Sequence, residues 1–509
     1  MHQSRSKLSR RSFLATGAIT AAIAPSLSAW SEPAAKSVAL NSKSTIDYLA
    51  GATDAAAWIR SAQRTTPEGL RWSPEPDHPE KLTTISPING IYSGGAGVVL
   101  FFLELAAATG DATYLEDAKK GADVLAETWN QDSTAHERIP GLGFSFYNGL
   151  AGVAFALIET WKATGIVQYK QAAIAATEYI VGSAKTIPNG LAWSSAPGII
   201  GDGSVILYLL YASEALHDDH YAKAATLAGE RLLSAGRPYP GGGLSWKGVP
   251  SSALGLPDET YFPNFELGTA GVAYVLARLY EKTHDKRFLY AATQGALHLQ
   301  NISTQKGTGA LISYRYPDLQ EVYYLGFCHG PAGSARLFYQ LYKVTDDPSY
   351  LDWTDRLARG VIESEIPENQ TPGLWNVVCQ CCGTAGLTSF FLGLWAATGK
   401  PEYYAYANKL AEHTLSHQTN FDGKGARWYQ AWTRVKPADV SAETGYSIGA
   451  AGVGAALIQA SLAQKGKYQT IGFPDNPFPT SQSPSTSASA LTSTAVAYEQ
   501  TAPSAVFEP

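Results

Sequence analysis

One motif recurs seven times along this 509-residue chain and constrains its fold more than any other feature. Each copy is a glycine-rich turn, usually Gly-x-x-Gly, followed by an apolar helical run with small residues. The second glycine of the copies falls at positions 97, 152, 203, 271, 333, 386 and 452, at intervals of 51 to 68 residues. The copy at Gly203 is degenerate because only its second glycine is in register. Recurrence at this scale indicates a repeat architecture.

Every interval also holds a second helix, in which a polar turn leads to Tyr or Phe and then to Ala and Leu at helical spacing. Residues 45–63 supply such a helix before the first copy. Residues three apart lie on one helix face, so paired glycines let neighbouring backbones approach closely where seven helices converge. The sequence therefore predicts an all-α fold, an α/α toroid of seven inner and seven outer helices over residues 45–466.

The two ends of the chain differ from this repeat region. Ser9–Leu14 contains the pair Arg10-Arg11 and is followed by an apolar run and by small residues up to Ala29. This order is typical of a twin-arginine signal peptide. We expect residues 1–29 to be that signal, residues 30–44 to be a linker, and the mature protein to be periplasmic or secreted. Residues 467–509, rich in Ser, Thr and Pro, are expected to form a disordered tail.

Composition excludes two classes of partner. Charged residues make up 16% of the chain and the net charge is −6, without the basic stripe that nucleic-acid binding requires. Apolar runs such as Val98–Ala108 are too short to cross a bilayer, so we expect no membrane span in the mature protein.

All four cysteines, namely Cys328, Cys379, Cys381 and Cys382, lie in two of the glycine turns. These turns read GFCHGPAG and VCQCCGTAG, and consecutive inner helices of a ring are neighbours in space. A helix N-terminus favours thiolate over thiol, and thiolates are ligands that zinc prefers. Cys328, Cys381 and Cys382 would supply three ligands and leave a fourth position open for water or substrate. The sequence therefore predicts a Zn²⁺ site at the mouth of the ring.

Two other arrangements of the cysteines remain open at this point. A structural disulfide, for example between Cys328 and Cys379, is typical of exported proteins. A closed structural zinc site would add Cys379 or His329 as a fourth ligand. The disulfide leaves the adjacent Cys381 and Cys382 unexplained, which favours the open three-ligand site.

From Thr45 to Ala463 the chain resembles the lanthionine synthetase C-like family, on its seven glycine turns with cysteines in the fifth and sixth. The resemblance implies an α/α toroid whose zinc activates a cysteine thiol of a peptide for addition to a dehydrated Ser or Thr. By this resemblance, Cys328 is the zinc ligand in the turn before the fifth inner helix. Cys381 is the cysteine of the Cys-His-Gly motif before the sixth inner helix, and Cys382 stands in place of the histidine of that motif. His329 follows the first ligand, where the cyclases usually have tyrosine, and is a candidate acid or base.

Three positions depart from the pattern of the cyclases in this family. Leu267 stands where they carry a histidine, Ser145 where they carry an aspartate, and Tyr324 where they carry an arginine. The resemblance therefore implies a zinc protein that activates a thiol or a water for addition to a peptide or small molecule, rather than ordinary lantibiotic cyclisation.

Two further function classes compete with this interpretation. A glycan-active α/α barrel would use the adjacent carboxylates Asp258 and Glu259, although glycosidases need two carboxylates across a cleft. Its other support is a set of loop tryptophans: Trp193, Trp246, Trp375, Trp428 and Trp432. The third class is a non-catalytic binding module whose zinc only ties the fifth and sixth inner helices together.

Overall fold

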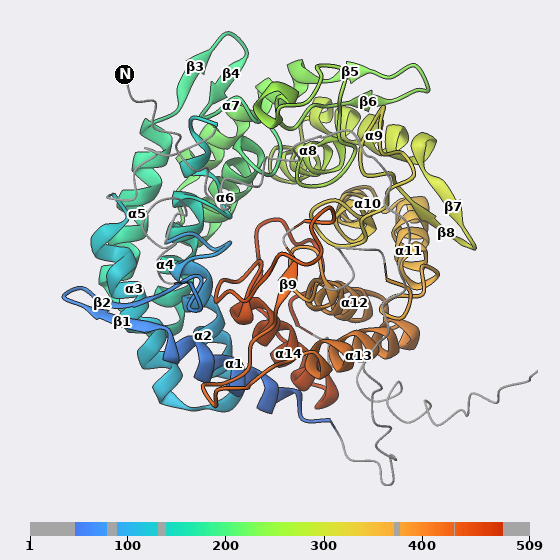
Figure 1. The fold of residues 1–509 in the computed structure, drawn as a ribbon. Coiled ribbons are helices and arrows are strands. Elements are labelled where there is room, and N and C mark those ends of the chain that lie inside the picture. The colour runs from blue at the N-terminus through green and yellow to red at the C-terminus, as the bar shows by residue number, and fades with distance from the viewer. Residues whose placement is uncertain (1–45, 79–88, 131–138, 371–376, 432, 482–509) are drawn as a thin grey trace, which may run out of the picture.

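The chain folds into a ring of helices in two concentric layers (Figure 1). The structure is a computed structural model that describes residues 46–78, 89–130, 139–370, 377–431 and 433–481. The expected signal peptide and linker lie outside these residues. The described residues form fourteen α-helices, which confirms the predicted α/α toroid.

The inner layer holds the seven helices that follow the glycine turns. They are α2 (Gly95–Thr109), α4 (Leu150–Thr164), α6 (Asp202–Leu216), α8 (Thr269–Thr283), α10 (Pro331–Thr345), α12 (Thr384–Thr398) and α14 (Ala450–Gln464). The outer layer holds α1 (Tyr48–Ser61), α3 (Ala112–Thr128), α5 (Val167–Gly182), α7 (Asp219–Ala235), α9 (Lys286–Ile302), α11 (Pro348–Ile362) and α13 (Pro401–Ser416).

Helix pairing closes the ring. Each inner helix from α2 to α12 packs against the outer helix that follows it, so the chain advances around the ring one hairpin at a time. The last inner helix, α14, packs instead against α1, the first helix of the fold. Because α14 also contacts α2, the first and last helices form the seventh hairpin and complete the circle.

The two layers differ in the side chains that build them. Every side chain of α2 from Ala96 to Leu105 is buried, as expected of a helix that is apolar all round. The outer helices bury one face, and several begin at an aspartate that accepts a hydrogen bond from the backbone N–H two residues later. These N-caps are Asp111, Asp218, Asp285 and Asp347.

Short antiparallel hairpins, which the sequence analysis does not predict, also occur in the described chain. They pair β1 (Gln63–Thr66) with β2 (Gly69–Trp72), β3 (Lys185–Ile187) with β4 (Gly190–Ala192), β5 (Arg237–Pro238) with β6 (Leu244–Ser245), β7 (Thr304–Lys306) with β8 (Gly309–Leu311), and β9 (Gln430–Ala431) with β10 (Val440–Ser441). Strands this short hold too few residues for an alternating pattern to register in the sequence.

In every turn except the third, the second glycine is required by a close backbone approach within the same turn. A Cβ on Gly333 would lie 1.9 Å from the carbonyl oxygen of Phe327, six residues earlier, and one on Gly386 would lie 1.9 Å from that of Gln380. The neighbouring turn is the second obstacle, because the same Cβ on Gly333 would lie 2.7 Å from Cβ of Phe265. Neighbouring turns therefore do approach each other closely at these glycines, as predicted. The carbonyl oxygen of the same turn lies closer still to the glycine.

Hydrogen bonds join the seven turns into a continuous circle, which we name the turn ring. One backbone N–H of each turn donates to the next turn around the ring. The bonds run from Tyr92 to Tyr147 O (2.8 Å), Phe146 to Ser204 Oγ (3.0 Å), Ile200 to Glu266 O (3.1 Å), Glu266 to Cys328 O (2.9 Å), Phe327 to Cys381 O (3.0 Å), Cys381 to Ser447 O (2.8 Å) and Ser447 to Tyr92 O (3.0 Å). The turn ring fixes the inner-helix N-termini relative to one another.

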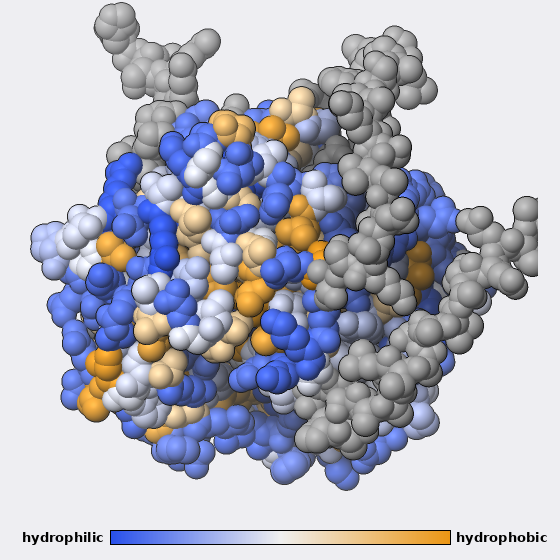
Figure 2. Space-filling view, turned by 90° about the horizontal axis from the view of Figure 1, so that it is seen from below, coloured by the Kyte–Doolittle hydropathy of each residue, from blue (hydrophilic) through white to orange (hydrophobic). Residues whose placement is uncertain are grey.

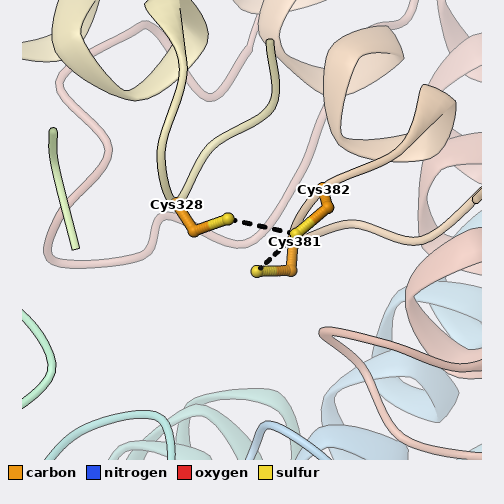
Figure 3. A group of neighbouring side chains, drawn as sticks. All are labelled: Cys328, Cys381 and Cys382. Carbon is orange, nitrogen blue, oxygen red and sulfur yellow. Dashed lines mark hydrogen bonds between the residues drawn. The ribbon is translucent and has the colours of Figure 1, made fainter. Parts of the chain in front are cut away.

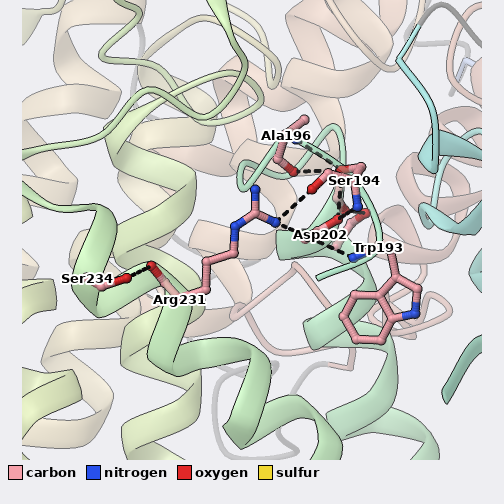
Figure 4. Close-up of polar contacts among 8 residues, drawn as sticks. Trp193, Ser194, Ala196, Asp202, Arg231 and Ser234 are labelled. Atoms are coloured by element: carbon pink, nitrogen blue, oxygen red, sulfur yellow. Dashed lines mark hydrogen bonds and ion pairs between the residues drawn. The ribbon is translucent and has the colours of Figure 1, made fainter. Parts of the chain in front are cut away.

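The degenerate third turn is held by a side-chain network instead of a tight glycine contact (Figure 4). A Cβ on Gly203 would lie 2.9 Å from the nearest carbonyl oxygen, which is less crowded than at Gly333. The buried carboxylate of Asp202 accepts hydrogen bonds from the backbone and hydroxyl of Ser194 at 2.9 and 2.7 Å. It also pairs with Arg231 of α7, which compensates its burial.

The expected tail begins later than Gly466. Residues 467–481, which we name the C-terminal hairpin, pack against the inner helices, and only the expected tail residues 482–509 lie outside the described chain. The two arms of the hairpin meet where Thr470 N donates to Thr480 O at 2.9 Å. Composition misled the prediction because a few buried aromatic side chains anchor a segment otherwise rich in Ser, Thr and Pro.

The tip of the C-terminal hairpin reaches beneath the turn ring. The ring of Phe473 lies 5.4 Å from that of Phe155 on α4, between centroids. The carboxylate of Asp475 accepts a hydrogen bond from Tyr147 Oη at 2.7 Å and pairs with Arg336 of α10 at 3.1 Å. Further along the hairpin, Phe478 packs between Tyr339 of α10 and Phe390 of α12.

The outside of the molecule is mixed in character. The flank that faces the bottom of Figure 1 is mainly hydrophilic, with hydrophobic residues scattered among the polar ones (Figure 2). Among the described residues, no helix combines the length and the apolar character needed to cross a bilayer.

Candidate metal centre

Two neighbouring turns of the turn ring bring the cysteines together. Cys328 lies in the turn before α10, and Cys381 and Cys382 lie in the turn before α12. The turns meet backbone to backbone: a Cβ on Gly326 would lie only 2.8 Å from Cα of Cys382. The fold therefore places these three side chains side by side from two separate stretches of sequence.

The three sulfur atoms converge (Figure 3). Cys328 Sγ lies 3.1 Å and Cys381 Sγ lies 3.5 Å from Cys382 Sγ, and all three lie within 4.8 Å of one another. Zinc–sulfur bonds of about 2.3 Å in a tetrahedral site hold sulfurs about 3.8 Å apart, so small movements would fit these three around one ion. All four cysteines are free thiols. The structure thus gives the disulfide alternative no support.

Cys379 borders this sulfur group and its thiol, after that of Cys328, raises the pKa of Cys382, but it is not one of the three sulfurs that lie within 4.8 Å of one another. Its buried Sγ accepts a hydrogen bond from the backbone N–H of Cys382 at 3.4 Å. It also packs within a small buried cluster with Cys328 and Cys381. Cys379 therefore supports the turn that presents Cys381 and Cys382.

The environment divides the three thiols into one acidic and two weakly acidic groups. Hydrogen bonds from Cys328 and Cys382, with a smaller one from Tyr92, hold the pKa of the Cys381 thiol well below its usual value. Burial raises the pKa of Cys328, and hydrogen bonding to Cys328 raises the pKa of Cys382. The surroundings therefore favour loss of the proton from Cys381 over loss from Cys328 or Cys382.

Two ionisable side chains, Glu266 and His329, complete the surroundings of Cys328. Their ligand atoms and the sulfur of Cys328 all lie within 4.8 Å of one another, and His329 Nε2 lies 3.8 Å from Glu266 Oε2. Burial raises the pKa of Glu266 well above its usual range, with a further contribution from the charge on Cys381. Burial also lowers the pKa of His329 to about 4. The site therefore favours the uncharged form of both groups.

The sequence analysis predicts His329 but misses Glu266 and Tyr92. All the turns except the third present to this region the residue two places before their first glycine, which we name the axial position. The axial residues are Tyr92, Tyr147, Glu266, Cys328, Cys381 and Ser447. Aligning the turns on their glycines and reading this column would have found both missed residues.

The three departures from the cyclase pattern supply no ionisable acid or base in the pH range near neutrality. Leu267 is buried, and the hydroxyl of Ser145 is buried without a hydrogen-bond partner. Tyr324 stacks on Tyr314 with ring centroids 4.3 Å apart and meets His329 edge-on at 5.3 Å. Glu266, next to Leu267, is the carboxyl group that this chain offers instead.

The features behind the glycan alternative are structural. Three of its tryptophans are buried and donate their indole N–H at 2.7 Å to carbonyl oxygens near outer-helix C-termini: Trp193 to Ile180, Trp246 to Leu232 and Trp428 to Thr414. Trp375 and Trp432 lie outside the described residues. Asp258 and Glu259 are exposed. The described residues therefore give the glycan alternative no support.

The ring of helices and its glycine turns make this protein an α/α toroid, and the cluster of thiols lies at the N-termini of its inner helices. The chain belongs to the lanthionine synthetase C-like protein family, whose family model matches residues 140–377 and 268–471. A search of curated proteins finds no match.

The solved structure of nisin cyclase shows the same fold. Nisin cyclase aligns with a TM-score of 0.55 and 16% identity, over 76% of this chain and 91% of its own. An α-mannanase from Bacteroides thetaiotaomicron aligns at 0.42 and 10% identity, over 82% and 97% of the two chains. Cellobiose 2-epimerase from Bacillus thermoamylovorans aligns at 0.42 and 9% identity, over 61% and 86%. At these identities the likeness to nisin cyclase concerns the fold alone.

Proposed function

We propose that this protein binds one zinc ion through Cys328, Cys381 and Cys382 and activates a thiol, or a water, for addition to a peptide or small molecule. The observation that carries the proposal is the convergence of three free thiols from two neighbouring turns. Membership of a family that includes zinc-dependent thioether-forming enzymes supports it.

A zinc ion held by three thiolates keeps a fourth position for a ligand and lowers the pKa of the group bound there. As a residue Cys382 is only half-buried, unlike Cys328 and Cys381, so it is the proposed ligand nearest to solvent. This exposure favours an accessible centre over the alternative of a closed, purely structural site.

The surrounding residues can manage the proton of an incoming thiol. His329 is held in its neutral form and has a buried Nδ1 without a hydrogen-bond partner, so its ring can accept a proton. Glu266 lies beside Nε2 and, in its ionised form, would stabilise the imidazolium that results. Tyr92 hydrogen-bonds to Cys381 and orients that sulfur.

The first test measures zinc by mass spectrometry on the full chain, purified without a metal-affinity tag. We expect about one zinc per chain in the wild type and a large loss in Cys381→Ala. Cys379→Ala is the matched control, because Cys379 borders the group without being one of the three proposed ligands, and should keep most of its zinc. Equal zinc content in the two variants would remove the basis of the proposal.

We also propose that the protein is exported by the twin-arginine route, which the motif at Ser9–Leu14 supports. Replacing both arginines, Arg10→Lys with Arg11→Lys, should retain the protein in the cytoplasm. Cell fractionation followed by immunoblotting measures this, and unchanged export would contradict the assignment.

A further inference from the structure

Cys328 has metal-binding residue types on both sides of it in the turn ring. The turns before α8, α10 and α12 are consecutive, and their axial residues are Glu266, Cys328 and Cys381. Glu266 N donates to Cys328 O at 2.9 Å, and Cys328 N donates to Cys381 O at 3.4 Å, so backbone hydrogen bonds fix the order of these three residues. Cys328 therefore has the other cysteines of the centre as neighbours on one side and Glu266 on the other.

The side of Cys328 next to Glu266 has a ligand set of its own. One oxygen of Glu266, one ring nitrogen of His329 and the sulfur of Cys328 all lie within 4.8 Å of one another, and His329 Nε2 lies 3.8 Å from Glu266 Oε2. In a tetrahedral zinc site with bonds of about 2.1 Å to nitrogen and oxygen, those two atoms lie about 3.4 Å apart. Small movements would therefore bring a sulfur, a nitrogen and an oxygen around one ion.

The charges of the centre favour a second cation. Three thiolates around one zinc ion leave one negative charge, and an ionised Glu266 adds another. Among the described residues, no lysine or arginine lies within 4.0 Å of the Glu266 carboxyl group, whose side chain is only 9% exposed. Uncompensated charge in a buried site costs free energy, and a second divalent ion would neutralise both negative charges.

We propose that Glu266, Cys328 and His329 form a second site for a divalent ion such as zinc, which shares the sulfur of Cys328 with the first site. The inference rests on the proposed function only for the first ion. The second ion binds more weakly, because a carboxylate and an imidazole replace two of the thiolates that zinc prefers. The second site therefore fills when free zinc is in excess, and a chain purified without added zinc keeps one ion.

A second ion would oppose the proposed function. That function uses His329 and Glu266 to manage the proton of an incoming thiol, whereas an ion in the second site would hold both side chains. The proposed function therefore belongs to the chain that carries one zinc ion, and excess zinc would act against it.

The first experiment counts zinc ions on the full chain by native mass spectrometry, at one equivalent of zinc and at an excess. We expect the wild type to carry one ion and then two, and Glu266→Gln and His329→Asn to carry one under both conditions. The ion that both variants retain shows that they are folded. The inference is wrong if the wild type never exceeds one ion, or if both variants take up the second ion as the wild type does.

Two further variants complete this experiment. Glu104→Gln is the matched control, because Glu104 is as buried as Glu266, both at 7% exposure, but hydrogen-bonds to the C-terminal hairpin instead. It should carry one ion and then two. Cys381→Ala damages the first site and leaves the second intact, so it should bind one ion, and only when zinc is in excess.

The two failures can be told apart. If Cys381→Ala loses the tight ion and no second ion binds to the wild type, the second site is wrong while the proposed first site stands. If Cys381→Ala binds zinc as the wild type does while Glu266→Gln loses an ion, the first site is wrong and the second remains. If His329→Asn weakens the tight ion and no second ion binds, His329 belongs to the first site and the inference is overturned.

The second experiment tests whether the two ions share a ligand. Cobalt(II) replaces zinc, and electron paramagnetic resonance follows the signal as the first and second equivalents are added to the full chain. Two cobalt ions bridged by one sulfur couple magnetically, so we expect the signal per cobalt ion to fall with the second equivalent. In Glu266→Gln the second equivalent should leave the signal of the bound ion unchanged. A wild-type signal that doubles with the second equivalent would show that Cys328 does not bridge two ions.

Discussion

At the scale of single residues, the turn geometry depends on a missing side chain. Because a Cβ on Gly333 would lie 1.9 Å from the carbonyl of Phe327, Gly333→Ala forces the backbone of the Cys328 turn to move. We expect it to lower the free energy of unfolding by about 3 kcal/mol. Gly182→Ala is the control, since nothing lies within 4 Å of its Cβ, and should change stability by less than about 1 kcal/mol. Urea unfolding of both variants measures this, and equal effects would contradict the account.

The cysteine residues of the site and His329 could be predicted from the sequence directly, whereas Glu266 and Tyr92 require the seven turns to be aligned on their glycines. Thiols are rare enough that Cys328 and Cys381 stand out without any structure. Glu266 and Tyr92 belong to common residue types, and only their axial register distinguishes them from other Glu and Tyr residues.

At the scale of elements, the C-terminal hairpin links the two helices that begin at the cysteine turns. The ring of Phe478 lies 4.8 Å from that of Tyr339 on α10 and 5.7 Å from that of Phe390 on α12. Phe478→Ala should cost about 3–4 kcal/mol of stability through the cavity it leaves. Phe421→Ala, at a ring 73% exposed, should cost less than about 1 kcal/mol. Thermal and urea unfolding measure the loss of stability in both variants. Equal losses would show that the C-terminal hairpin contributes little to the stability of the ring.

A buried carboxyl group makes the attachment of this hairpin depend on pH. Glu104 of α2 accepts hydrogen bonds from Ile471 N and Thr470 Oγ1, both at 2.9 Å, and burial raises its pKa to about 7. An acid whose pKa rises on folding favours the fold below its unfolded value near 4.5, and this contribution is lost as the pH rises through about 7. Glu104→Gln removes the titration but keeps an acceptor oxygen.

We therefore expect Glu104→Gln and the wild type to be similarly stable at pH 5, and the variant to be more stable at pH 8 by about 2–3 kcal/mol. Urea unfolding at pH 5, 6, 7 and 8 measures the difference. A difference that stays constant across this range would show that Glu104 does not titrate on folding.

The elements themselves were predictable to different degrees. Most outer helices carry 3.6-residue periodicity and recurrent start signals, such as the cap Asp347 before α11, and the inner helices are apolar runs that follow the glycine turns, so the sequence suffices to find them. The C-terminal hairpin has no period and is held by a few side chains, chiefly Phe473 and Phe478, that contact helices far away in sequence. Its order depends on a cavity that exists only once the ring has formed.

At the scale of the whole molecule, the turn ring should open as one unit. Each turn donates to the next, so losing one turn leaves its neighbours on both sides unsatisfied. We expect the amide hydrogens of Glu266, Cys381 and Ser447 to exchange with similar free energies, close to that of global unfolding. Hydrogen exchange with peptide-level mass spectrometry measures this. Exchange of one turn several orders of magnitude faster than the others would show that the turns open independently.

The pairing of α1 with α14 has a consequence for the time at which the protein becomes complete. Synthesis proceeds from the N-terminus, so α1 leaves the ribosome early and waits for a partner made some four hundred residues later. Until then its apolar face, including Ala52, Ala55 and Ile59, has nothing to cover it. Both cysteine turns are synthesised by Gly386, before α14 exists. We infer that both cysteine turns can form while the ring of inner helices still lacks α14. During this stage of synthesis a metal ion would have its widest access to the thiols.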